Sequence, residues 1–241
     1  MKKIGLFSVS MLFSLILLAQ KQVNDPLAQE RKVSSFHAIK VATGIKLYLN
    51  QGGTEAVAVS ASKEEYRDKI VTKVENGVLR IYYEQETLKF WKNITTKGRN
   101  PVAYVSVDDL DGLDISSGAS VVVDGSIKGS KLDLDASSGG VFSGAIDFTT
   151  VTVDQSSGSV VKISGTATSL KIDGSSGSMF NGYDLAVGNC DADVSSGAGA
   201  QITVNKEMNA EASSGGHVSY KGEGVIRNIR TSSGGGVSRK K

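Results

Sequence analysis

The residues of this chain best suited to chemistry are acidic side chains that recur along its second half. Each of six stands two residues before a Ser-Ser-Gly triplet: Asp114, Asp135, Asp154, Asp173, Asp193 and Glu211. If the repeated units stack, these carboxylates lie about 5 Å apart, and they repel one another unless water, a donor such as Lys171 or a cation offsets their charge. Calcium binding and, beside a basic residue, cleavage of acidic polysaccharides are the chemistries open to such a row.

A structural explanation of the acidic residues competes with both chemistries. Asp commonly accepts hydrogen bonds from the backbone N–H groups of a turn that follows it, and a turn follows each of these residues. The spacing also differs from that of the glycine-rich nonapeptide repeat that binds calcium. We therefore favour turn-stabilising carboxylates, keep the six residues as weak candidates for a cation site, and take Lys171 as the best candidate base for an enzyme.

The Ser-Ser-Gly triplets occur seven times, at intervals of 21, 19, 19, 20, 18 and 19 residues. They are Ser116-Ser117-Gly118, Ser137-Ser138-Gly139, Ser156-Ser157-Gly158, Ser175-Ser176-Gly177, Ser195-Ser196-Gly197, Ser213-Ser214-Gly215 and Ser232-Ser233-Gly234. A period near 20 residues is typical of a solenoid. Seven equivalent serines cannot all be nucleophiles, so we interpret the triplets as turns in which Gly takes a positive φ and stacked Ser hydroxyls hydrogen-bond to one another.

Apolar residues flank every triplet at fixed offsets. The residues three before and five after its first Ser are always apolar, for example Val153 and Val161 around Ser156. Alternation on each side predicts two short strands, and a third cluster such as Ile146 with Phe148 predicts a third short face. The sequence therefore predicts an all-β fold, a single-stranded right-handed parallel β-helix with coils of about 19 residues.

The ends of the chain predict export and a capped solenoid. Residues 1–19 have the basic start and apolar run of a signal peptide, with cleavage expected near Ala19, although an uncleaved anchor is the alternative. We expect a linker over residues 20–30, a β-rich N-terminal cap with one short helix over 31–110, the repeats over 111–238 and a basic tail over 239–241. Such a protein would lie in the periplasm or on the surface of a Gram-negative bacterium, with no transmembrane segment after cleavage.

Composition argues against several classes of partner and of catalytic site. The net charge of +2 gives no reason to expect nucleic acid or an anionic membrane as the main partner. Cys190 stands at an apolar position of its repeat, which predicts a buried thiol. His37 and His217 are far apart, and no spacing supports zinc, a phosphate loop or a catalytic triad, so we expect neither a catalytic set nor a cofactor.

One aromatic pair is a candidate contact for a partner. Phe90 and Trp91 lie between two lysines, and Trp91 is the one Trp of the chain. An exposed Trp beside bases can stack on a sugar or contact a protein, whereas packing against the solenoid is the structural alternative.

Two segments and the repeats that follow them resemble a known bacterial family. Thr43–Gly52 (TGIKLYLNQG) and Val74–Ile81 (VENGVLRI), followed by the Ser-Gly repeats, are similar to the autotransporter adhesin family with a head GIN domain, over roughly residues 33–238. The resemblance implies an exported protein, common in Bacteroidetes-like bacteria, with a β-helix akin to pectin lyases but without their catalytic set, and a role in cell adhesion.

The leading hypothesis is therefore a non-enzymatic exported protein that contacts a cell-surface glycan or protein. A pectin-lyase-like enzyme acting on polysaccharides and a calcium-stabilised scaffold are the alternatives.

Overall fold

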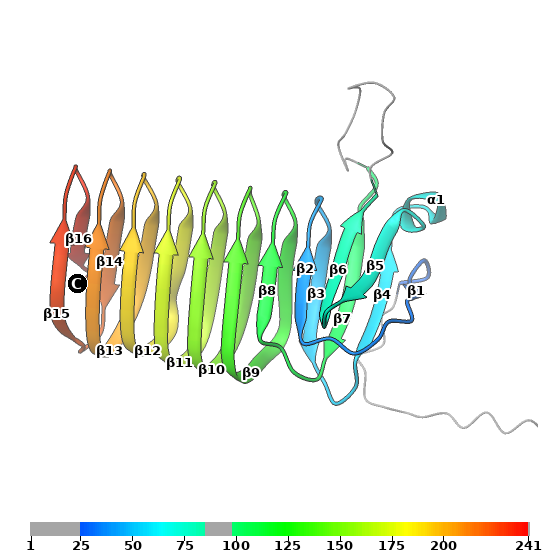
Figure 1. Cartoon of the computed structure of the whole chain (residues 1–241), viewed down its shortest axis with the longest axis horizontal. Coiled ribbons are helices and arrows are strands. Elements are labelled where there is room, and N and C mark those ends of the chain that lie inside the picture. The colour runs from blue at the N-terminus through cyan, green and yellow to red at the C-terminus, as the bar shows by residue number, and fades with distance from the viewer. Residues whose placement is uncertain (1–24, 85–97, 241) are drawn as a thin grey trace, which may run out of the picture.

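The structure is a computed structural model that describes residues 25–84 and 98–240 (Figure 1). The predicted signal peptide, the first part of the linker and the Phe90–Trp91 pair lie outside the described residues. Sixteen strands are hydrogen-bonded into one continuous sheet, and α1 (Glu64–Arg67) is a single short turn of helix.

The repeats form a solenoid in which each coil is one long strand. The coil strands are β9 (Ser120–Ala136), β10 (Val141–Gln155), β11 (Val160–Gly174), β12 (Met179–Val194) and β13 (Gly199–Ala212). Each pairs in parallel with the next, and the tight turns that join them lie along one corner (Figure 1). The last coil consists of β14 (His217–Lys221), β15 (Val225–Thr231) and β16 (Gly236–Arg239). The predicted parallel β-helix is confirmed.

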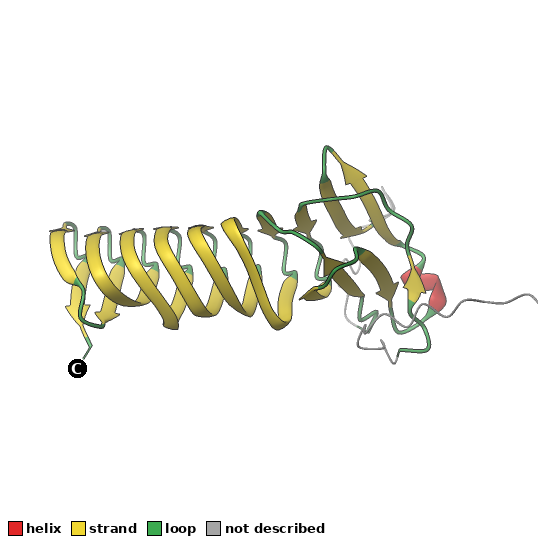
Figure 2. Ribbon diagram, turned by 90° about the horizontal axis from the view of Figure 1, so that it is seen from below, coloured by secondary structure: helices red, strands yellow, loops and turns green. Residues whose placement is uncertain are grey.

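The strands are longer than predicted. We expected three short faces per coil, whereas β9 to β13 run for 14 to 17 residues around the far side of the coil (Figure 2). The reason is that hydrogen bonding to the neighbouring coils continues through the bends, where register shifts such as the one between Lys162 and Ser164 absorb the change of direction. The inward apolar clusters remain, as Ile146 with Phe148 and Val151 with Val153 show in β10.

Columns of aligned apolar side chains fill the interior. Val121, Phe142, Val161 and Phe180 lie in register on successive coils, and all are buried. Glycine on a neighbouring coil leaves room for a large aromatic ring. A Cβ at Gly129 would lie 2.5 Å from Cε1 of Phe148, so the ring occupies the volume that a side chain there would need.

The N-terminal part extends the same two walls of the solenoid. On one wall, β2 (Ala38–Val41) lies in parallel between β6 (Val78–Tyr83) and β8 (Gly112–Ile115); on the other, β3 (Lys46–Gln51) lies in parallel between β7 (Val102–Val107) and β9. Antiparallel strands finish both walls: β5 (Ile70–Glu75) beside β6, β4 (Ala56–Ser60) beside β7, and β1 (Gln29–Glu30) beside β4. One hydrophobic core runs through both parts of the chain.

Candidate interaction surface: the carboxylate row

The Ser-Ser-Gly triplets are type I′ turns. In the first, the Ala119 N–H donates to the Ser116 carbonyl at 3.0 Å, and φ is 52° at Ser117 and 71° at Gly118. A positive φ at both central residues defines this turn type, and all seven triplets have it. The glycine prediction is confirmed. The positive φ of the second serine was not foreseen, because Ser is less common than Asn at that position.

Backbone groups, rather than hydroxyls, join one turn to the next. The Gly139 N–H donates to the Ser157 carbonyl at 3.1 Å, and the same bond recurs along the corner. The hydroxyls of the triplet serines make no hydrogen bond to any described residue, so the expected chain of hydroxyls is wrong. Thr43-Gly44 adds an eighth turn of the same geometry, and its Gly44 N–H donates to the Ser117 carbonyl at 3.0 Å.

The six acidic residues stack in register on the outer face of one wall. The strand pairing places Asp114, Asp135, Asp154, Asp173, Asp193 and Glu211 side by side on consecutive coils, followed by Arg230. We call these six residues the carboxylate row. All are exposed except Asp114, which is half-buried. Neighbouring coils lie about 4.8 Å apart, so the row is a line of negative charge parallel to the solenoid axis.

The expected hydrogen bonds from the turns to these carboxylates are not formed. The turn N–H groups are already used by the backbone: that of Ser156 donates to the Ala136 carbonyl at 3.0 Å, and that of Ser159 to the Ser156 carbonyl at 3.1 Å. The carboxylates of Asp135, Asp154, Asp173 and Asp193 consequently accept no hydrogen bond from any described residue. Solvation carries these four charges, which corrects the turn-stabilising interpretation.

Basic side chains close the carboxylate row at both ends. Lys40 lies next to Asp114 in the strand register and forms an ion pair with it, and Arg80 lies beyond Lys40. At the other end, Nη1 of Arg230 is 4.0 Å from Oε2 of Glu211. The interior members of the row form no such ion pair with a residue that the structure describes.

Burial and, after it, crowding of like charges raise the pKa values of two members of the row. Burial, followed by the charges of Asp114 and Asp154, raises the pKa of Asp135, although Lys40 acts against this. Burial, followed by Glu211 and Asp173, likewise raises the pKa of Asp193, with Lys171 acting against it. Both carboxylates hold a proton more tightly than an isolated Asp does.

Lys171 lies in the adjacent column rather than between Asp154 and Asp173. It pairs in register with Thr152 on one side and Asp191 on the other. Together with Asp191, Asp193, Asn209, Glu211 and Arg230, it borders a shallow depression of about 170 Å³. Pockets for small ligands usually measure roughly 300–1,000 Å³. Within residues 25–84 and 98–240, no three His, Cys, Asp or Glu side chains are grouped as a metal site.

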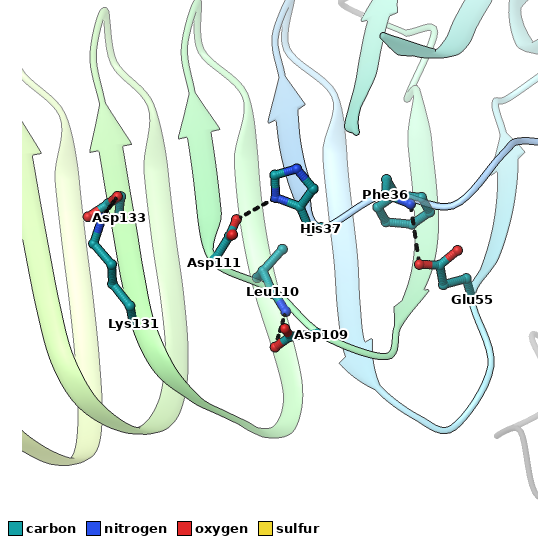
Figure 3. Close-up of polar contacts among 8 residues, drawn as sticks. All are labelled: Phe36, His37, Glu55, Asp109, Leu110, Asp111, Lys131 and Asp133. Atoms are coloured by element: carbon teal, nitrogen blue, oxygen red, sulfur yellow. Dashed lines mark hydrogen bonds and ion pairs between the residues drawn. The ribbon is translucent and has the colours of Figure 1, made fainter. Parts of the chain in front are cut away.

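The remaining candidates are distributed over the molecule. Cys190 is buried, and its burial raises the pKa of the thiol to about 12, in line with the predicted core position. Nδ1 of His37 lies 2.8 Å from Oδ1 of Asp111 at the start of the solenoid (Figure 3), whereas Nε2 of His217 lies 3.1 Å from Oγ of Ser238 in the last coil. The two histidines therefore do not share a site.

An aromatic pair that sequence reasoning missed lies on the opposite wall. Tyr48 and Tyr104 are stacked, with ring centroids 5.5 Å apart, and Nζ of Lys46 lies 4.8 Å from the Tyr48 centroid. The Tyr104 hydroxyl donates to Asp25 at 3.1 Å; burial and this carboxylate raise the pKa of Tyr104 to about 12. The two tyrosines are far apart in sequence and adjacent in the sheet, so the pairing of β3 with β7 was the missing information.

These features define a capped parallel β-solenoid with extended outer faces and a shallow depression beside Lys171. The family model described as "Putative auto-transporter adhesin, head GIN domain" matches residues 35–224, and the chain belongs to this family. No curated protein matches the sequence. In the described residues, no helix has the length and apolar character needed to cross a membrane.

Three solved structures share the fold at 16% sequence identity. A putative adhesin from Bacteroides fragilis NCTC 9343 has a TM-score of 0.76, with 88% of this chain and 95% of that chain covered. A putative lipid binding protein from Parabacteroides distasonis ATCC 8503 has a TM-score of 0.67, with 89% and 96% covered. A putative adhesin from Parabacteroides merdae ATCC 43184 has a TM-score of 0.61, with 89% and 95% covered.

Proposed function

We propose that this chain is a non-enzymatic exported protein that mediates adhesion. It would lie in the periplasm or on the outer surface of the cell. Membership of an adhesin family supports this proposal. The observation that carries it is the repetition of one exposed side chain per coil along a continuous sheet. Such a surface offers many weak, equivalent contacts to a glycan or protein, and avidity adds up over such contacts.

The carboxylate row is the contact that we propose. The four interior carboxylates form no ion pair with any described residue. Burial and acidic neighbours raise the pKa values of Asp135 and Asp193, although Lys40 and Lys171 act against the rise. A cationic partner surface would offset the negative charge of the row and so reduce the repulsion between its carboxylates, whereas a neutral surface would not. We therefore expect the partner to present amino or guanidinium groups at intervals along an extended surface.

A binding experiment with two matched variants tests this proposal. In the first, Asp135→Asn, Asp154→Asn, Asp173→Asn and Asp193→Asn neutralise the row; in the second, Ser143→Ala, Lys162→Gln, Asn181→Ala and Gln201→Ala change four residues of the opposite wall. We expect the first to reduce binding of the purified protein to target cells at least fivefold and the second to leave it unchanged, as measured by flow cytometry. Equal binding by both variants would remove the row from the proposed function.

Surface location has its own test. Brief protease treatment of intact cells, followed by detection with an antibody to the mature chain, should remove the protein if it is exposed. A chain that survives this treatment in intact cells but is cut after lysis would overturn a role in adhesion between cells.

The depression beside Lys171 gives the enzymatic alternative a concrete test. Lys171 is close enough to Asp193 to counteract the rise of its pKa, and both border the depression. An enzyme would cleave acidic polysaccharides in solution, with turnover lost in Lys171→Ala. We expect no turnover from the unaltered chain, and reproducible cleavage would replace the adhesion proposal.

A further inference from the structure

The outermost strands differ between the two ends of the solenoid. At the end that carries α1, the outer strands are β1, which has two residues, and β5, which carries an ion pair of 2.8 Å between Lys73 and Glu75. At the opposite end the outer strands are β15 and β16, and each is paired on one side only among the described residues (Figure 1). A strand paired on one side leaves alternate N–H and C=O groups without strand partners on the other.

An apolar column that is buried elsewhere comes to the surface at β15. Ile229 continues the column of Ile172, Ala192 and Ala210, all of which are buried, yet 44% of Ile229 is exposed. Val225, four residues earlier on the same strand, is 56% exposed. Ile229 thus presents the apolar interior that a further coil would cover, whereas Val225 pairs with the exposed Glu207 and belongs to the outer face.

Two arginines lie on the same strand as this apolar edge. Nη2 of Arg227 donates to Oε1 of Glu207 at 2.5 Å, and Arg230 lies beside Glu211, so each contacts an acid of the preceding coil. A guanidinium has five N–H donors, which leaves donors for a second acid on the open side. Arg239 and Lys240 add positive charge at the same end.

We propose that β15 is a docking edge for an extended acidic segment of a partner protein, which adds to the sheet as one more strand. The segment alternates apolar and acidic residues, so that an apolar side chain covers Ile229 and a carboxylate meets Arg230. The chain itself contains this pattern at Leu132-Asp133-Leu134-Asp135, where Leu134 and Asp135 occupy the columns of Ile229 and Arg230.

Two other occupants fit the edge less well. A lipid surface could take the apolar side chains and the arginines, but hydrocarbon offers no partners to the backbone groups of the strand. A second copy joined end to end would bring the arginines of both copies together, which like-charge repulsion opposes. An acidic strand satisfies the backbone, the apolar column and the arginines at once. This inference goes beyond the adhesion proposal and does not rest on it.

Binding of a synthetic peptide by the full chain tests the proposal. The probe is a fluorescein-labelled peptide with the sequence of residues 130–137, and its comparison peptide has lysine in place of both aspartates. We expect the acidic peptide to bind at least tenfold more tightly in fluorescence anisotropy and Arg230→Glu to reverse the preference. Lys162→Glu, on the opposite wall, is the control and should leave the preference unchanged. Circular dichroism confirms that both variants are folded.

Two further measurements separate strand addition from other kinds of association. Methylation of alternate backbone nitrogens of the acidic peptide, on the edge that would face β15, should abolish binding; retained affinity would overturn strand addition. Vesicles of phosphatidylcholine with phosphatidylglycerol should not bind the chain in an Arg230-dependent manner. Such binding in the absence of peptide binding, or a dimer in sedimentation that Arg230→Glu alters, would assign the edge to lipid or to a second copy and overturn the proposal.

Discussion

The second serine of each triplet is the residue whose conformation is least ordinary for its type. Ser157 has a φ of 52° and Gly158 a φ of 69°, the pair of values that a type I′ turn requires. Only the glycine reaches this region at no steric cost. Each turn therefore depends mainly on its glycine, while the serine supplies a small side chain that tolerates the strained position.

Replacing the glycine of a middle turn tests this division of roles. A Cβ at Gly158 would meet no atom within 4 Å, so Gly158→Ala changes the backbone preference and little else. We expect it to lower the free energy of unfolding by about 1–2 kcal/mol, measured by urea denaturation. Ser157→Asn should instead raise it, because Asn favours a positive φ. Destabilisation by both changes would contradict the turn assignment.

At the scale of the strand, the carboxylate row costs free energy of folding, because its charges are partly buried and repel one another. Because the folded state raises the pKa values of Asp135 and Asp193, it binds their protons more tightly than the unfolded chain does. The resulting penalty is fully present above the raised pKa values. It disappears as the pH falls through them towards the ordinary value of 3.8.

The double variant Asp135→Asn, Asp193→Asn should remove this penalty. We expect a gain of about 1 kcal/mol in the free energy of unfolding at pH 7, after allowance for solvent screening, and no gain well below pH 3.8, where both states are protonated. Urea denaturation across this pH range measures the difference. Asp108→Asn, outside the row, should give no such gain. A stabilisation that does not depend on pH would argue against a cost of charging these two carboxylates.

The strands also show how far the sequence can predict such a surface. The repeat, the inward columns and the stacking of the acidic residues were predictable, because a fixed period places equivalent residues side by side. The absence of hydrogen bonds from the turns to the Asp carboxylates was not predictable, because it depends on which turn N–H groups donate to the neighbouring coil. A turn at Gly44 was expected, but its place in the corner of the repeats was not, because Thr43-Gly44 lacks the double serine. Lys171 was misplaced because its column is offset from the row by two residues.

For the whole molecule, the absence of ion pairs between the interior of the row and any other described residue bears on the calcium-scaffold alternative. The described carboxylates form no grouped metal site, and the four interior members of the row are solvated rather than ion-paired. We expect the melting temperature of the purified chain to change by less than about 1 °C on addition of EDTA or of millimolar calcium, since a ligand stabilises only in proportion to its binding to the folded state. A rise of several degrees with calcium, abolished in the four-Asn row variant, would revive the scaffold hypothesis.

The turn-to-turn and strand-to-strand hydrogen bonds all run from coil to coil, along the long axis of the solenoid (Figure 1). Tension applied between the two ends would therefore load one inter-coil interface at a time, and the coils would peel away in sequence. Each released coil of about 19 residues adds roughly 65 Å of extended chain, so stretching a single molecule should give a regular sawtooth of force peaks. A tether of this kind would lengthen in small steps under tension, and so would stay attached under flow.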